Sequence, residues 1–111
     1  MKKELIKLLK SKNLIGKIVC VDLDGTLCNG VYWVGMEEHP PVNEKMADFV
    51  RSLDDRGAFI VIWTARPIVL MTKTYKWLAA HNINYPLAFR LKPPADCYID
   101  DRCLNIDDIK I

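Results

Sequence analysis

The sequence predicts an α/β fold in which a parallel sheet is covered by helices on both faces. Two apolar stretches, over residues 18–21 of a segment that spans 17–22 and over residues 58–63, lack the alternation of a half-exposed strand. They read as strands buried on both sides. Segments with the apolar spacing of amphipathic helices stand before and between them. Strands that alternate with helices favour parallel pairing, because each helix carries the chain back across the sheet.

No repeat, low-complexity tract or interdomain linker interrupts this order, so residues 1–111 are expected to form one domain. Residues 1–15 hold an amphipathic helix that docks on the core or, since lysines flank its apolar side, lies on a membrane surface. Asn43 is expected to cap a helix that ends before Gly57. The expected elements are a helix over 2–12, a strand over 17–22, a helix over 43–56, a strand over 58–63, a helix over about 64–81, a short strand within 83–91 and a strand over 96–100.

One connection is too short for an ordinary parallel crossover. Only residues 92–95 separate the third strand region from the fourth, whereas a parallel crossover usually needs about a dozen residues or more. We therefore expect either a third strand that ends early or a crossover helix that is reduced to a turn.

Charge and cysteine content narrow the class of protein. The 16 basic and 14 acidic residues leave a net charge of +2, without the basic stripe of a dedicated nucleic-acid binder. No apolar stretch reaches the roughly 18 residues of a membrane span, and the N-terminus lacks a signal-peptide core. Cys20, Cys28, Cys97 and Cys103 match no zinc-binding spacing. Reduced thiols in the cytoplasm are therefore expected.

Two acids follow the first predicted strand directly, in the sequence Asp-Leu-Asp-Gly-Thr-Leu over residues 22–27. Side chains two residues apart in an extended chain point to the same side. The carboxyl ends of parallel strands are where open α/β sheets hold their ligands. Asp22 and Asp24 would repel each other at this edge unless a cation or a proton relieved them. The motif therefore indicates a site of chemical function at this edge of the sheet.

Further polar residues stand at later strand ends or in the loops beside them. Thr64 comes just after the second strand, Lys92 just before the Pro-Pro turn, and Asp100 with Asp101 at the end of the fourth strand. Parallel strands would bring them to the same edge of the sheet as the first two acids. Carboxylates together with substrate phosphate are the ligands that Mg²⁺ takes. A hydroxyl and an ammonium suit the remaining phosphate oxygens, because phosphoryl transfer needs mainly positioning and charge neutralisation. The sequence thus predicts a Mg²⁺-dependent phosphate site.

Taken in order, these motifs resemble those of the haloacid dehalogenase (HAD) superfamily of phosphatases, over about residues 17–104. The resemblance implies a three-layer Rossmann-like fold. It implies that Asp22 is the nucleophile, forms an aspartyl-phosphate and binds Mg²⁺. It also implies that Asp24 protonates the leaving oxygen, activates the attacking water and binds the metal through its backbone carbonyl. Residues 92–102 resemble small, capless bacterial and phage members linked to polysaccharide biosynthesis.

The resemblance gives roles to the later motifs as well. Thr64 and Lys92 would hold the transferred phosphate. Asp100 would complete the metal site, with Asp101 in contact with the metal directly or through water. Arg66, which follows Thr64 closely, is a candidate for substrate binding.

Each of these residues has a structural alternative. Thr64 could cap the following helix, instead of or in addition to binding phosphate. Lys92 could be a solvated surface lysine, and Asp101 could pair with Arg102. An ion pair facing solvent is the ordinary role for an arginine such as Arg66.

The predicted site has no room for a cap domain, because residues 27–42 are too few to form one and the region before Lys92 is shorter still. Tyr32 and Trp33 could form a flap that packs on a sugar or a base, or could pack on their own loop. An open site suits a large substrate or a lid borrowed from a neighbouring subunit, so a homo-oligomer is one expected arrangement.

The sequence therefore predicts a cytoplasmic, Mg²⁺-dependent phosphomonoester hydrolase. Its expected partner is a phosphorylated substrate, such as a sugar phosphate or a larger molecule. The sequence gives no strong signal for nucleic-acid binding, and no membrane partner is expected. Two alternatives stay open: a phosphatase module that acts on a polynucleotide end, and a noncatalytic phosphate-binding or assembly domain.

Overall fold

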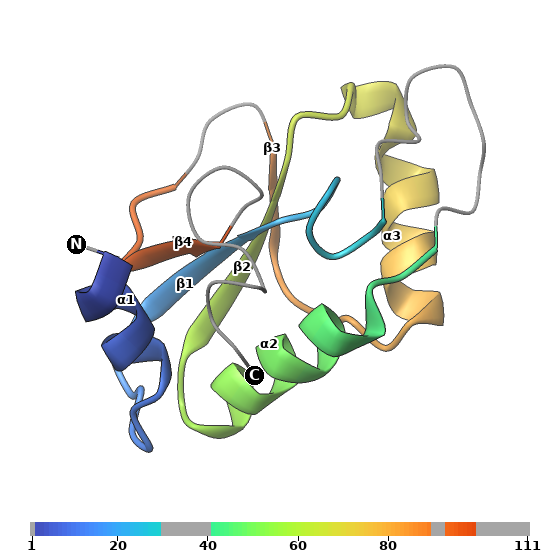
Figure 1. Ribbon diagram of the computed structural model, residues 1–111. Helices are drawn as coiled ribbons and strands as arrows, with labels where there is room; N and C mark the ends of the chain where they lie inside the picture. Colours follow the sequence, from blue (N-terminus) through green and yellow to red (C-terminus); the bar gives the residue numbers. More distant parts are fainter. Residues whose placement is uncertain (1, 30–40, 90–92, 100–111) are drawn as a thin grey trace.

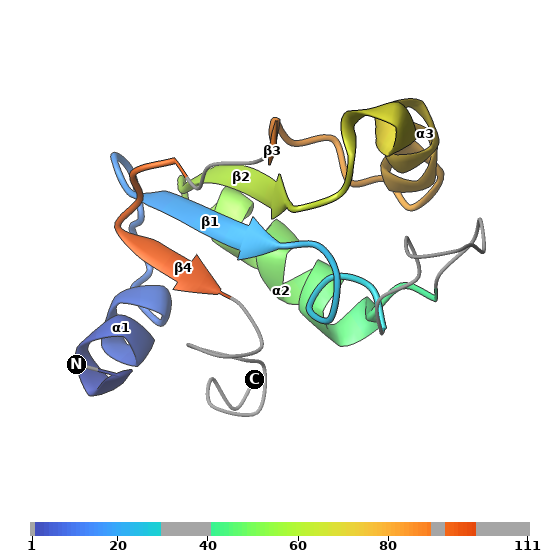
Figure 2. The same cartoon turned by 90° about the horizontal axis from the view of Figure 1, so that it is seen from above.

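The computed structural model describes residues 2–29, 41–89 and 93–99, and it places four parallel strands in one sheet. Helices flank this sheet (Figures 1 and 2). The architecture is α/β and consistent with a Rossmann-like three-layer fold, as the sequence predicts. The strands are β1 (Ile18–Asp22), β2 (Phe59–Thr64), β3 (Leu87–Phe89) and β4 (Cys97–Ile99), in the order β3-β2-β1-β4, and the helices are α1 (Lys2–Leu9), α2 (Glu44–Asp55) and α3 (Met71–Ala80), with a short 3₁₀ helix, η1 (Ile68–Leu70), before α3.

Strand β1 lies between β2 and β4, at the centre of the sheet. Its three middle residues, Val19 to Val21, are all buried, as an uninterrupted apolar run predicts. The parallel register pairs Asp22 with Trp63, next to the last residue of β2. The carboxyl ends of β1 and β2 therefore meet at one edge of the sheet.

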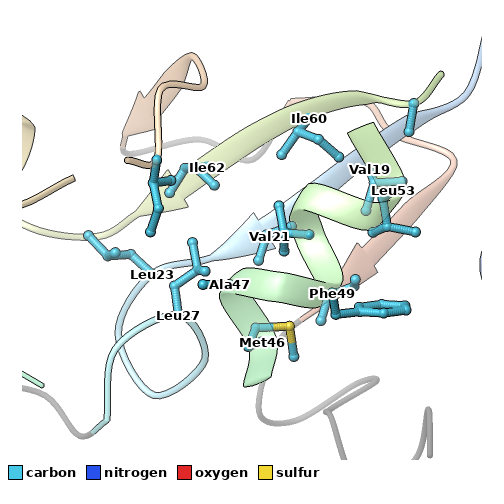
Figure 3. Packing of buried hydrophobic residues seen from close by; sticks show 14 of the residues in the cluster. Val19, Val21, Leu23, Leu27, Met46, Ala47, Phe49, Leu53, Ile60 and Ile62 are labelled. Carbon is cyan, nitrogen blue, oxygen red and sulfur yellow. The ribbon is translucent and has the colours of Figure 1, made fainter. Parts of the chain in front are cut away.

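The buried side chains of α2 meet those of β1 and β2 in one apolar cluster (Figure 3). Full burial of a side chain of this size stabilises the fold by about 1.5–3 kcal/mol, so the cluster fixes α2 against the two strands that carry the site. Its members from these three elements are Met46, Ala47, Phe49, Val50 and Leu53 of α2, Val19 and Val21 of β1, and Ile60 and Ile62 of β2.

Helix α2 begins where the sequence places its cap. The side chain of Asn43 accepts a hydrogen bond from the backbone N–H of Met46 at 3.0 Å. The backbone N–H of Asn43 donates to the carbonyl of Leu27 at 2.7 Å, and that of Asn29 donates to Pro41 at 2.8 Å. The start of α2 is thus tied to the loop that follows β1.

The predicted N-terminal helix docks on the core, which is the simpler of its two interpretations. Leu9 is fully buried, and three further apolar residues of α1 pack against the core cluster. The guanidinium of Arg56 donates to the carbonyls of Leu9 and Ser11 at 2.6 and 2.8 Å, at the end of the helix. Among the described residues, no helix combines the length and apolar character needed to cross a bilayer.

The second half of the chain differs from the expected one at the helix that follows β2. The helix after β2 begins at Met71, with Leu70 as its N-cap residue, so the alternative in which Thr64 caps that helix is wrong. Strand β3 spans Leu87–Phe89. The connection that follows it includes residues 90–92, which lie outside the described residues, so the two alternatives for this connection stay predictions. Residues 30–40, with the predicted flap of Tyr32 and Trp33, lie outside the described residues.

We expect Asn43→Ala to lower the free energy of unfolding by about 0.5–2 kcal/mol, because it removes the acceptor for an N–H at the start of α2. Urea unfolding followed by circular dichroism measures the change. Asn43→Asp keeps an acceptor oxygen and is the matched control, with stability close to that of the wild type. Equal stability of the alanine variant and the wild type would contradict a role for this cap.

Candidate active site

The loop after β1 closes tightly around the second acid of the motif. Gly25 has a φ of +81°, which glycine adopts without strain. The backbone N–H of Cys28 donates to the carbonyl of Leu23 at 2.9 Å, and that of Gly25 donates back to the carbonyl of Cys28 at 3.1 Å. Asp22 ends the strand and Asp24 sits inside this closed loop, so the two acids occupy different surroundings.

The turn after β2 is shaped by a threonine hydroxyl. Thr64 is fully buried at the end of the strand, and its Oγ1 accepts a hydrogen bond from the backbone N–H of Arg66 at 3.1 Å. Thr64 therefore holds the turn that follows β2, and α3 begins only later, at Met71. Arg66 is consequently fixed beside the loop that follows β1.

Arg66 and Asp24 form a two-pronged ion pair. Nη2 donates to Oδ1 at 2.8 Å, and Nε donates to Oδ2 at 3.1 Å. The side chains are only 7% and 10% exposed, respectively. Each oxygen of the Asp24 carboxyl group accepts one hydrogen bond, so the group faces the guanidinium fork with both oxygens. The pair joins the loop after β1 to the turn after β2.

Two buried side chains complete this network. Thr74 of α3 accepts a hydrogen bond from Arg66 Nη1 at 3.0 Å and donates its own hydrogen to the carbonyl of Leu70 at 2.8 Å. The thiol of Cys28 donates to Asp24 Oδ1 at 3.5 Å and accepts from Arg66 Nη2 at 3.9 Å. The contacts thus run without a gap from α3 through Arg66 to the acid.

The environment of Cys28 keeps it protonated. Burial raises the pKa of its thiol to about 12, the negative charge of Asp24 acts in the same direction, and Arg66 opposes both. A thiol is a nucleophile or a metal ligand only as thiolate. Cys28 is therefore a packing and hydrogen-bonding residue at neutral pH.

Comparison with known proteins places the chain in a family. A family model described as the LNS2 domain of PITM 1-3 matches residues 19–96, well over half of the chain. The chain belongs to the LNS2-domain family. This family is a HAD-like, phosphatase-type group, so the LNS2 match agrees with the resemblance to the HAD superfamily. No match was found among curated proteins or among solved structures.

The structure of this LNS2 domain brings Asp22, Asp24, Thr64 and Arg66 to one edge of the sheet. Arg66 forms an ion pair, as its structural alternative states, but the pair is buried where a solvent-facing one was expected. Their chemical roles stay predictions. Lys92, Asp100, Asp101 and Arg102 lie outside the described residues, as does Cys103.

Thr74 belongs to the site through its bond to Arg66, although it is not among the candidate residues predicted from the sequence. A signal was available, because Leu70, Thr74 and Leu78 follow one another at intervals of four residues. That spacing places a hydroxyl on the buried side of a helix, where it needs a partner. Only the fold shows that the partner is Arg66.

The types of oxygen atom that Asp22 and Asp24 offer suit the expected Mg²⁺. Magnesium takes carboxylate and carbonyl oxygens, and Asp22 supplies a carboxylate at the strand end. Both side-chain oxygens of Asp24 are engaged by Arg66, which leaves its backbone carbonyl as the group for a metal. In the part of the chain that the structure describes, no group of three or more histidines, cysteines or acids could hold a metal ion.

We expect Cys28 to resist alkylation in the folded protein. Only the thiolate reacts with the reagent, and the raised pKa of about 12 keeps the thiol protonated at lower pH. Native protein treated with iodoacetamide at pH 8 should show slow modification of the peptide that contains Cys28. The same protein unfolded in urea is the control and should react quickly. Equal rates in the two states would contradict the described burial.

Proposed function

We propose that this LNS2 domain is a Mg²⁺-dependent phosphomonoester hydrolase that works through an aspartyl-phosphate at Asp22. The proposal is supported chiefly by the placement of the two acids at the end of β1. Asp22 is the last residue of the strand, and Asp24, in the loop that follows, faces Arg66 with both carboxyl oxygens. Paired carboxylates in different environments suit the separate tasks of nucleophile and proton carrier.

The reaction divides into two transfers. In the first, a carboxylate oxygen of Asp22 attacks the phosphorus, the ester P–O bond breaks, and the leaving oxygen takes a proton from Asp24. For this step Asp24 has to be in its carboxylic-acid form, with one of its two hydrogen bonds to Arg66 open. In the second, water attacks the phosphorus of the aspartyl-phosphate and gives a proton to Asp24, while the bond to Asp22 breaks. Inorganic phosphate leaves, and both acids return to their starting states.

Thr64 is able to hold the transferred phosphate although its oxygen is engaged. Its Oγ1 accepts the N–H of Arg66, and a hydroxyl keeps one hydrogen to donate. That hydrogen suits a phosphate oxygen at the same sheet edge. Lys92 is the proposed second phosphate ligand and would supply a positive charge.

Mg²⁺ would be held by the carboxylate of Asp22 and the backbone carbonyl of Asp24, with Asp100 and Asp101 as the proposed further ligands. When bound, the ion supplies positive charge that offsets the charges of the phosphate and the acids. We further propose that the site is open and uncapped, as in the small capless members of the superfamily. A sugar phosphate or a larger phosphorylated molecule is then the substrate, and a second copy of the chain is a candidate lid.

One observation favours a second candidate, a noncatalytic phosphate-binding domain. Both oxygens of Asp24 are occupied in the ion pair, so proton transfer requires one of these hydrogen bonds to open. A domain that never opened it would bind phosphate at this edge without turning over. A polynucleotide end is a narrower substrate class within the enzymatic proposal.

We expect Asp22→Asn to abolish hydrolysis of p-nitrophenyl phosphate in the presence of Mg²⁺, and Asp24→Asn to slow it by roughly 10²–10⁴-fold, the usual value of general acid–base catalysis. Initial rates of nitrophenolate release measure both effects, and a chelator should remove the activity of the wild type.

Asp48→Asn is the matched control, because Asp48 is 75% exposed and pairs with Arg51 on α2, away from the site. It should keep wild-type rates. Full activity of Asp22→Asn would refute the nucleophile. A wild type that binds phosphate but hydrolyses no ester of a broad panel would favour the noncatalytic domain.

A further inference from the structure

We infer that Arg66 is a positioning residue for Asp24, held in place by Thr74, and that it is not a ligand of the substrate phosphate. The inference rests on the proposed function, since it takes Asp24 to be the proton carrier. It replaces the substrate-binding role expected for Arg66 from the sequence, and it gives α3 a part in catalysis.

All three nitrogens of the guanidinium have partners within the protein. Nε and Nη2 donate to the two oxygens of Asp24, and Nη1 donates to Thr74. The side chain is only 7% exposed. A guanidinium recognises phosphate through the same forked edge that here faces a carboxylate. A forked contact with phosphate through this Nε/Nη2 edge would therefore require Arg66 to give up Asp24, its buried partner.

The fork restrains the carboxyl of Asp24 in a way that a single bond would not. Two parallel N–H donors fix both the position and the plane of the carboxyl group. Proton transfer needs its acid within hydrogen-bond reach of the reacting oxygen, and small displacements are costly. The pair holds the group in one orientation, and the opening of one prong would expose a single oxygen to the leaving group.

Thr74 extends this restraint to α3. Its hydroxyl hydrogen is directed at the carbonyl of Leu70, which leaves an oxygen lone pair for Arg66 Nη1. Thr74 is fully buried, so water cannot take the place of its hydroxyl as the acceptor for Arg66. Loss of the hydroxyl would leave an N–H of Arg66 buried without a partner. The guanidinium would then hold Asp24 less firmly.

A positioning role has a kinetic signature that phosphate binding lacks. Cleavage of an ester with a poor leaving group depends on proton donation more than cleavage of one with a good leaving group. Loosening of Asp24 should therefore reduce kcat/KM for phenyl phosphate more than for p-nitrophenyl phosphate. Inhibition by inorganic phosphate should not change, because Arg66 does not touch the phosphate.

The test compares the wild type, Thr74→Val and Arg66→Lys with both esters. Thr72→Val is the matched control, because Thr72 is an exposed threonine on the same helix. We expect Thr74→Val to lower kcat/KM for phenyl phosphate by about tenfold, which is a part of the rate enhancement that a general acid contributes. The loss with p-nitrophenyl phosphate should be smaller. Arg66→Lys keeps the charge but loses the fork, and should show the same selective loss.

Arg66→Lys disturbs a buried ion pair and is at risk of unfolding, whereas Thr74→Val leaves that pair in place. Thr74→Val in the Asp24→Asn background provides a second test. There it should have no further effect on the preference between the two esters, since it acts only through Asp24.

Equal losses with both esters, together with weaker inhibition by phosphate, would show that Arg66 binds substrate and would overturn the inference. Wild-type kinetics of Thr74→Val would also overturn the inference. The same would follow if Thr74→Val changed the preference between the two esters as strongly in the Asp24→Asn background as in the wild type. A wild type that hydrolyses neither ester would overturn the proposed function, and the positioning role with it.

Discussion

The buried ion pair between Arg66 and Asp24 is the interaction on which the arrangement of this site depends. Pairing of β1 with β2 brings two strand ends together, but it does not fix the loops that follow them. The guanidinium fork does so, because it joins those loops across 42 residues of sequence. Removal of one partner from a buried pair costs about 3–5 kcal/mol. The loops therefore keep their geometry together or lose it together.

Much of the fold could be predicted because its signals are local. The apolar runs of β1 and β2 read directly as buried strands, and Asn43 is a cap residue at the place where α2 begins. The position of Asp22 and Thr64 at one edge then follows from parallel pairing alone. The LNS2 family match agrees with this α/β, HAD-like assignment.

What the sequence could not supply depends on contacts between distant residues. Arginine is usually exposed, and nothing near Arg66 in the chain shows that its partner is Asp24. The start of α3 at Met71, after the 3₁₀ helix η1, is likewise not indicated by the sequence pattern. Thr74 gains a role only when α3 is placed beside that turn. Local secondary-structure propensity does not indicate the partner of Arg66, the start of α3 or the role of Thr74.

The proposed transfer of a phosphoryl group to Asp22, at the edge formed by β1 and β2, would leave a covalent intermediate on the protein. Rapid acid quench of the enzyme during hydrolysis of an aryl phosphate, followed by peptide mass spectrometry, tests it most directly. We predict one phosphoryl group on the peptide that contains Asp22, at higher occupancy in Asp24→Asn, which hydrolyses the intermediate slowly. Turnover in which the phosphoryl group is found on another residue would contradict the account.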